Sequence, residues 1–287
     1  MADDATVMAE FVRRKSIWEH LVAEGGSPPQ LSATELRDCG VVGGQQGIWR
    51  NQERTRDLTE QGNGVTVSVM HKAGRYSDEI TVDGMDYHYP VTQRPGRTDE
   101  AEIDATRSAG ELGLPVFIVT DSGAEGRVVQ LGAVRGANDS TQRFFIAFLD
   151  QWPQTLLPWT LSLQESPAPY GKPLHRRQLF RFKAIEYYGA QCSVCDVKVT
   201  DLLDATLLIA QRAPGTDDPR NGLVLCANHR KAFELGLFAI DNDNISVNFR
   251  AGMSAELLGI TVQSLVGLAM KPNLAALEWN FKRWKGH

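Results

Sequence analysis

Apolar side chains near the start of the chain recur every three or four positions. In residues 5–24 this spacing is typical of an amphipathic helix, which Gly25 and Gly26 would end. A second, shorter helix is expected after Ser32. We therefore predict a helical segment over residues 1–40.

After these helices the pattern changes to short apolar runs between glycine-rich turns. Runs of β-branched and aromatic residues at 65–69, 116–120 and 144–148 are typical of β-strands. Residues 99–112 interrupt these runs with apolar positions near helical spacing and with acidic residues early in the segment. This alternation predicts an α+β fold, with a first domain over residues 41–150.

Prolines separate the two halves of the chain. Five of them fall in residues 151–175, too many for a helix or a central strand. We predict an interdomain linker there, with Trp152 and Trp159 packing the two domains together. The remainder, residues 176–287, is predicted to form a second domain. Its helices are expected at 176–188, from about Asn228, at 254–270 and at 274–284.

Charge divides the chain at the same place. The 287 residues are 42% hydrophobic and 23% charged, with a net charge of −5. Residues 1–150 hold 15 Lys and Arg against 23 Asp and Glu, whereas residues 151–287 hold 15 against 12. A protein that coats nucleic acid through overall positive charge is therefore excluded, but a local basic face is not.

The number of cysteines and the length of the apolar runs indicate in which cellular compartment the protein is found. Four cysteines are too few for a disulfide scaffold in a chain of this length, which favours a reducing environment. Uninterrupted apolar stretches fall short of the ~18 residues that a membrane span needs, and the first residues are acidic rather than basic. We expect a cytoplasmic protein with no membrane contact.

Two short pairs of metal-type ligands stand in the second half. Cys192 and Cys195 are separated by two residues, and after 30 further residues Cys226 and His229 are separated by two more. Three thiolates and one imidazole in paired spacing are typical of a closed, tetrahedral structural zinc site. Chance spacing is the alternative. A redox role for the first pair is disfavoured because no βαβ pattern surrounds it.

The residues around these ligands carry a family resemblance. Segments 177–181, 188–195, 202–205, 218–229 and 232–238 resemble the HNH endonuclease domain of Mcr-type, modification-dependent restriction enzymes. The resemblance covers roughly residues 176–241. It implies a ββα-metal fold, two strands and a helix braced by structural Zn²⁺, which holds a catalytic divalent ion against a DNA phosphate.

The chain departs from this family at two catalytic positions. The family uses a histidine as general base, an asparagine that fixes the geometry, and a second histidine that helps to hold the catalytic metal. The resemblance places Leu207 and Arg230 at the histidine positions, while Asn221 remains and Asn280 stands where histidine is frequent. Leucine accepts no proton, and arginine repels a divalent cation. We expect a degenerate domain and assign no catalytic residue to it. The alternative is an active nuclease that uses Mg²⁺ or Mn²⁺ and draws its missing groups from elsewhere, for instance His175 or the carboxylates of Asp201 and Asp204.

The first domain carries a second resemblance. Segments 47–50, 64–68, 74–76, 87–90, 93–96 and 101–106 resemble the sulfur-binding domain that reads phosphorothioate DNA, over about residues 41–150. The resemblance places an apolar sulfur pocket at Tyr89 and Pro90, with Gln93 close by. Sulfur is larger and less hydrated than oxygen, so a dry apolar cup discriminates between them. An edge strand that ends at Pro90 is the alternative. The arginines expected to bind neighbouring phosphates are Arg50, Arg75, Arg94 and Arg97.

Together these features predict a two-module DNA-binding protein. A reader of modified double-stranded DNA, with phosphorothioate favoured, is joined to a zinc-stabilised HNH-like domain that binds without efficient cleavage. Two other interpretations stay open: an active modification-dependent endonuclease, and a reader of a modified base that is flipped into a pocket. The sequence also leaves a homodimer open.

Overall fold

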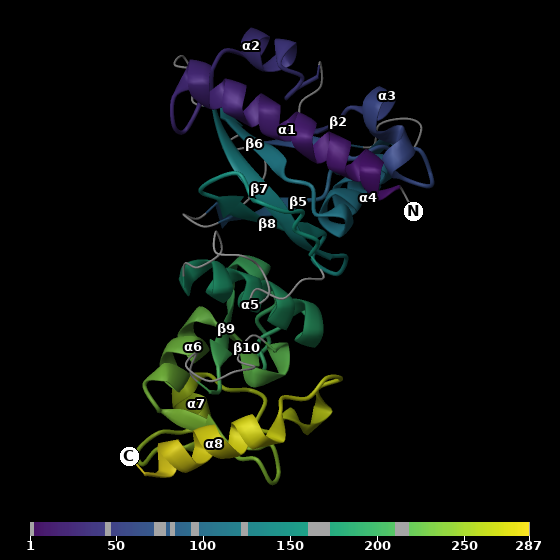
Figure 1. The fold of residues 1–287 in the computed structure, drawn as a ribbon. Helices are drawn as coiled ribbons and strands as arrows, with labels where there is room; N and C mark the ends of the chain where they lie inside the picture. The colour runs from purple at the N-terminus through teal and green to yellow at the C-terminus, as the bar shows by residue number, and fades with distance from the viewer. Residues whose placement is uncertain are drawn as a thin grey trace. The chain divides into compact units, whose positions relative to one another are not determined.

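The computed structural model describes residues 3–43, 47–71, 79–80, 84–92, 98–121, 126–159, 173–209 and 218–286 (Figure 1). The chain divides into two compact units, residues 1–175 and residues 176–287. Each unit has its own hydrophobic core. Among the described helices, none combines the length and the apolar character needed to cross a membrane.

A twisted sheet forms the centre of the first unit. Its strands run in the order β2-β3-β6-β7-β8-β5-β4, and β1 pairs with β7. Strands β3 and β6 are parallel, and the other neighbours are antiparallel. The strands are β1 (Gln30–Leu31), β2 (Ile48–Arg50), β3 (Thr66–His71), β4 (Glu79–Ile80), β5 (Gly84–His88), β6 (Val116–Asp121), β7 (Arg127–Asn138) and β8 (Arg143–Leu149).

The two longest helices of this unit contribute side chains to the core formed by the sheet. The three predicted apolar runs lie in β3, β6 and β8, and the two longer predicted helices are α1 and α4. Val7 and Phe11 of α1 and Ala109 of α4 join the core formed by the strands. The mixture of helix and strand confirms the α+β prediction. The helical segments of this unit are α1 (Asp4–Gly25), α2 (Ala33–Asp38), α3 (Gln52–Thr55), η1 (Arg56–Leu58) and α4 (Thr98–Leu112).

A buried cation fixes α1 to the sheet. Arg14 is 0% exposed, and its Nη1 donates to the carbonyl oxygens of Thr66 (2.9 Å) and Pro115 (2.7 Å). Its Nε donates to Glu10 Oε1 at 2.8 Å. Burial by itself would raise the pKa of Glu10, but hydrogen bonds and charge from Arg13 and Arg14 lower that pKa below its ordinary value. Arg14 thus ties α1 to the start of β3 and to the residue before β6.

The first residues of the predicted linker pack onto the first unit. Leu157 is fully buried, and its N–H donates to the carbonyl of Gly113 at 2.9 Å. The ring of Trp152 lies 5.2 Å from that of Phe11, and Trp159 packs over Gly110. Trp152 and Trp159 were expected to pack the two domains together. Their contacts with Phe11 and Gly110 lie within the first unit, where both rings pack against its hydrophobic core.

The second unit contains two small antiparallel hairpins and several helices. One hairpin pairs β9 with β10, and the other pairs β11 with β12. The elements are α5 (Pro173–Tyr188), η4 (Thr200–Leu202), β9 (Leu203–Leu207), η5 (Pro219–Asn221), β10 (Gly222–Cys226), α6 (Ala227–Glu234), β11 (Phe238–Ile240), β12 (Val247–Phe249), α7 (Ala255–Leu258), η6 (Leu265–Gly267) and α8 (Leu274–Lys285).

The predicted helix over residues 254–270 is wrong. Helix α7 ends at Leu258 because Gly259 adopts the left-handed conformation (φ +69°) and closes the C-terminus. Further along, Ser264 forms an antiparallel bridge with Ser246. The apolar residues of this segment, such as Ile260 and Leu265, still enter the core. Ile260 lies in the irregular chain after α7, and Leu265 lies in the single turn η6, so the apolar positions that suit one long helix belong to separate short segments.

Candidate metal centre and adjoining pocket

The four predicted zinc ligands come together in the second unit. Cys192, Cys195, Cys226 and His229 are all buried, and their ligand atoms lie within 4.8 Å of one another. Cys195 Sγ lies 3.9 Å from Cys226 Sγ, and His229 Nδ1 lies 3.6 Å from Cys192 Sγ and 3.1 Å from Cys226 Sγ. Tetrahedral zinc with Zn–S bonds of about 2.3 Å separates two sulfurs by about 3.8 Å. The cluster therefore fits a structural zinc ion.

A backbone carbonyl sets the tautomer of the histidine. His229 Nε2 lies 2.9 Å from the carbonyl oxygen of Leu258, at the end of α7. A carbonyl only accepts, so Nε2 carries the proton and the lone pair of Nδ1 faces the three thiols. This second contact orients the imidazole as metal-ligating histidines require. The sequence gives no signal for it, because the partner is a main-chain atom.

Main-chain hydrogen bonds fix the backbone around Cys192 and join it to β10, the strand that carries Cys226. The N–H of Cys192 donates to Val197 O at 2.9 Å, and the N–H of Ser193 donates to Val224 O at 2.8 Å. Cys226 ends β10 and precedes the first turn of α6, so His229 follows on that helix. Burial, together with the neighbouring Cys192 and Cys226, raises the pKa of the Cys195 thiol to about 12 against the lowering effect of a backbone hydrogen bond from Val197. A bound cation is what would stabilise three buried thiolates here.

Two of the catalytic positions of the family resemblance lie at the end of the β9–β10 hairpin away from Cys226. Leu207, half-buried, ends β9 opposite Gly222. Asn221 is buried, and its side chain accepts from Ile209 N–H (3.1 Å) and donates to Ile209 O (3.2 Å). Asn280 of α8 donates to Leu208 O at 3.1 Å. Both asparagines therefore fix the chain that follows β9.

Arg230 of α6 is committed to an ion-pair network. Its Nε lies 3.1 Å from Asp204 Oδ2, and its Nη1 contacts Glu234. Arg177 of α5 donates to the same Asp204 oxygen at 2.9 Å. One carboxylate on β9 is thus held between two guanidinium groups. Asp204, one of the carboxylates proposed as a substitute for the missing catalytic groups, is therefore already paired with two arginines, and the sequence gives no signal for its contact with Arg177.

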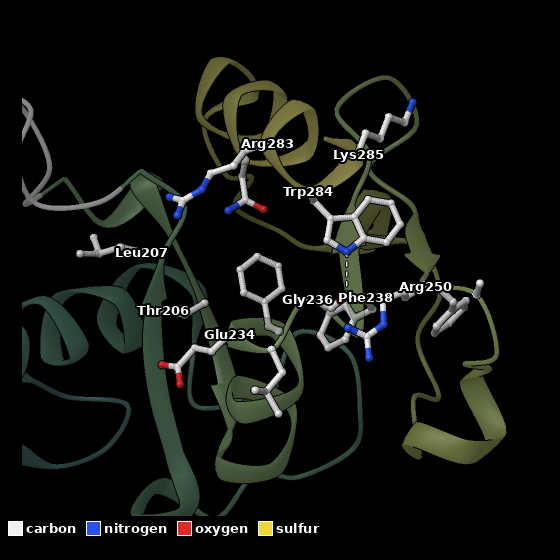
Figure 2. Close-up of a pocket in the computed structure, with 14 residues that line it drawn as sticks. Thr206, Leu207, Glu234, Gly236, Phe238, Arg250, Arg283, Trp284 and Lys285 are labelled. Carbon is white, nitrogen blue, oxygen red and sulfur yellow. Dashed lines mark hydrogen bonds between the residues drawn. The ribbon is translucent and has the colours of Figure 1, made fainter. Parts of the chain in front are cut away.

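A cavity of about 700 Å³ opens beside Leu207, between β9, α6, the β11–β12 hairpin and α8. Figure 2 shows Phe238 and Trp284 within it, with the Arg283 guanidinium extending toward the β9 end and Arg250 on the other side of Trp284. The indole Nε1 of Trp284 donates to Gly236 O at 2.9 Å, drawn as a dashed line in Figure 2. Sequence reasoning did not identify this pocket, because its walls come from four separate elements.

Comparison with known protein families finds a match for the part of the chain that contains the β9–β10 hairpin, α6 and the ligand cluster. Residues 192–241 match the HNH endonuclease family. The matched residues span β9, β10, α6 and β11, together with all four metal ligands. This HNH segment confirms the predicted ββα arrangement with a cluster able to hold zinc.

Comparison with whole structures gives weaker likenesses. The modification-dependent TagI restriction endonuclease is 16% identical, over 88% of this chain and 90% of that one, with a TM-score of 0.37. The SRA domain of SUVH5 in complex with fully methylated CG DNA is 21% identical, over 45% and 90%, with a TM-score of 0.28. The type IV phosphorothioation-dependent restriction endonuclease ScoMcrA is 12% identical, over 97% and 68%, with a TM-score of 0.27. A comparison with curated proteins finds no match.

The residues predicted to read sulfur lie in the first unit, and the structure describes three of them. Tyr89 follows β5 and is 5% exposed, with its ring 4.5 Å from that of Phe144. Its hydroxyl accepts from Arg107 (3.0 Å) and donates to Asp139 (3.1 Å). Pro90 beside it is half-buried. Arg50 Nη1 donates to the carbonyl of Asn63 at 2.6 Å. Lying outside the described residues are Arg75, Gln93, Arg94 and Arg97.

Proposed function

We propose that this protein binds modified double-stranded DNA and that its HNH segment holds DNA without cutting it efficiently. The observation that carries the proposal is that Arg230 is paired with Asp204 of β9, the strand that Leu207 ends, because Leu207 and Arg230 are the two positions where the family resemblance expects histidines. A nuclease of this class needs a proton acceptor and a divalent cation at the scissile phosphate. Leu207 supplies no proton acceptor.

The electrostatics around Asp204 also oppose a catalytic cation. Arg177 and Arg230 already neutralise the one carboxylate that β9 offers, and Glu234 is engaged by Arg230. A divalent ion would have to displace at least one guanidinium group and would then meet its positive charge. The role proposed for Zn²⁺ is structural, and Mg²⁺ or Mn²⁺ would matter only if the alternative, an active endonuclease, were correct.

The first unit is proposed to recognise the modification, with a phosphorothioate linkage favoured. Tyr89 and Pro90 would form the apolar contact for sulfur, Gln93 would lie close by, and Arg50, Arg75 and Arg94 would bind the surrounding phosphates. The excess of carboxylates in residues 1–150 weakens binding to ordinary DNA, which leaves discrimination to the specific contact. Because Tyr89 is already packed against Phe144, the accessible part of this contact is assigned to the half-buried Pro90.

Competition binding tests the reader. Labelled phosphorothioate duplex is bound by the zinc-loaded protein without added Mg²⁺ or Mn²⁺ and then competed with unmodified, phosphorothioate, or cytosine-methylated duplexes of identical sequence. We expect the phosphorothioate competitor to be the most effective. Equal competition by unmodified DNA would contradict a reader function, and strongest competition by methylated DNA would replace the sulfur mark with a modified base.

Two variants locate the contact. Tyr89→Phe removes the hydroxyl that bonds Arg107 and Asp139 but keeps the packed ring, whereas Pro90→Ala removes the half-buried ring beside it. We expect Pro90→Ala to lose most of the preference for phosphorothioate DNA and Tyr89→Phe to keep it. An unchanged preference in Pro90→Ala would refute this placement of the sulfur pocket while leaving DNA binding intact.

A further inference from the structure

The cavity beside Leu207 has a net positive lining. Arg250, Arg283 and Lys285 contribute cations, and Glu234 is the one acidic side chain among the lining residues. Glu234 is already paired with Arg230. Across the described parts of the chain, no carboxylate pairs with Arg250 or Arg283. These two guanidinium groups are therefore available to an anion from outside.

The protein also fixes the backbone that carries these arginines. Arg250 follows β12, and its N–H donates to Leu237 O at 3.0 Å. Helix α8 is attached on either side of Arg283, through Asn280 to Leu208 O and through Trp284 to Gly236 O. An ordered backbone lowers the entropy that a binding arginine must lose.

Gly236 makes the attachment of α8 possible. Its φ of +65° lies in the left-handed region, and a Cβ there would lie 3.4 Å from the indole Cδ1 of Trp284. That distance is an ordinary van der Waals contact, so the cost of a side chain at this position is the backbone strain of the left-handed conformation. The geometry of the pocket depends on this turn.

Aromatic rings complement the cations. The half-buried Trp284 lines the same cavity and stacks on Phe281 with the ring centroids 5.6 Å apart, while the buried Phe233 and Phe238 lie beneath it in the cavity wall. A DNA strand alternates anionic phosphates with largely apolar deoxyribose rings, so it matches a surface that combines guanidinium groups with aromatic faces. The cavity, at about 700 Å³, is far larger than one phosphate group requires.

We infer that Arg250 and Arg283 bind backbone phosphates of one DNA strand that runs across this cavity beside the HNH segment. The inference rests on the proposed function, since it assumes that DNA is the partner. Both arginines lie outside the residues that match the family. The contact would therefore be supplied by the β11–β12 hairpin and α8, and it would hold DNA whether or not the segment can cut.

The salt dependence of binding to unmodified duplex DNA tests this inference. Each phosphate contact contributes about −0.9 to the slope of log K against log salt concentration, so Arg250→Gln with Arg283→Gln should make the slope less negative by about 1.8. Lys198→Gln with Lys271→Gln removes two exposed cations of the same unit that do not line the cavity, and it should leave the slope unchanged. Zinc content reports that both variants are folded.

The outcomes separate the two claims. If the wild-type protein binds unmodified DNA and the arginine variant keeps the wild-type slope, the phosphate site is refuted and the reader function is untouched. An equal change in the lysine variant would also refute it, because the effect would then be one of overall charge. If the wild-type protein binds neither modified nor unmodified duplex at low salt, the proposed function itself fails.

Discussion

Removing the metal from the Cys192, Cys195, Cys226 and His229 cluster should unfold the second unit and leave the first one folded. Structural zinc contributes an apparent ~10–16 kcal/mol to small zinc domains at neutral pH, whereas a whole domain is stable by only about 5–15 kcal/mol. The four side chains are at most 6% exposed, so without a cation they leave a polar cluster inside the core. The loss therefore exceeds what the rest of the unit can offset.

Calorimetry of the full chain with and without a strong chelator measures this effect. The metal-bound protein should show two unfolding transitions, one for each unit, and the chelated protein should keep only the transition of the first unit. Cys195→Ser should reproduce the chelated state. Cys39→Ser is the matched control, because Cys39 lies in the first unit and is partly exposed. Two unchanged transitions after complete removal of zinc would refute the structural role of the cluster.

Three further predictions concern α1 and the HNH segment. Arg14→Ala should lower the free energy of unfolding of the first unit by about 3–5 kcal/mol in urea titrations, because it removes a fully buried side chain and leaves the carbonyls of Thr66 and Pro115 without their donor, although Arg13 still pairs with Glu10. Lys15→Ala on the exposed face should cost below about 1 kcal/mol. The pKa of Glu10 is lower in the folded than in the unfolded state, so the ionised carboxylate stabilises the fold at pH values above the ordinary pKa of 4.5. This stabilisation is lost as the pH falls through the lowered pKa of the folded state. The difference in unfolding free energy between wild type and Glu10→Gln should therefore shrink as the pH is lowered from 4.5. Leu207→His combined with Arg230→His should gain nicking of supercoiled plasmid in Mn²⁺, and the matched Leu207→Asn with Arg230→Gln, which is polar but has no imidazole, should not.

The zinc centre is the part of the site that could be predicted from sequence. Its four ligands stand in two short pairs, and each pair needs only a local turn to converge. The accepting carbonyl of Leu258 could not be foreseen, because every residue has a carbonyl and its position depends on where α7 packs. The same limit applies to the pairing of Arg177 with Asp204, which are 27 residues apart.

The secondary structure shows the same division between local and distant information. Helix α1 and strands β3, β6 and β8 have strong periodic patterns and lie where they were predicted. Residues 254–270 have apolar positions that suit a helix, yet Gly259 ends α7 and the following residues meet the core from irregular chain and the single turn η6. The cavity lined by Arg250 and Arg283 is formed by segments that are distant in the sequence, so no single stretch of the sequence predicts it.

Single-turnover cleavage of bound DNA tests the central claim most directly. Excess protein is mixed with labelled phosphorothioate duplex in Mg²⁺ or Mn²⁺, and the same samples are followed for binding and for strand scission. The arrangement of Leu207, Arg230 and Asp204 predicts DNA that is fully bound and stays intact through many binding half-lives. Metal-dependent scission of most of the bound duplex within that time by the wild-type protein would contradict it.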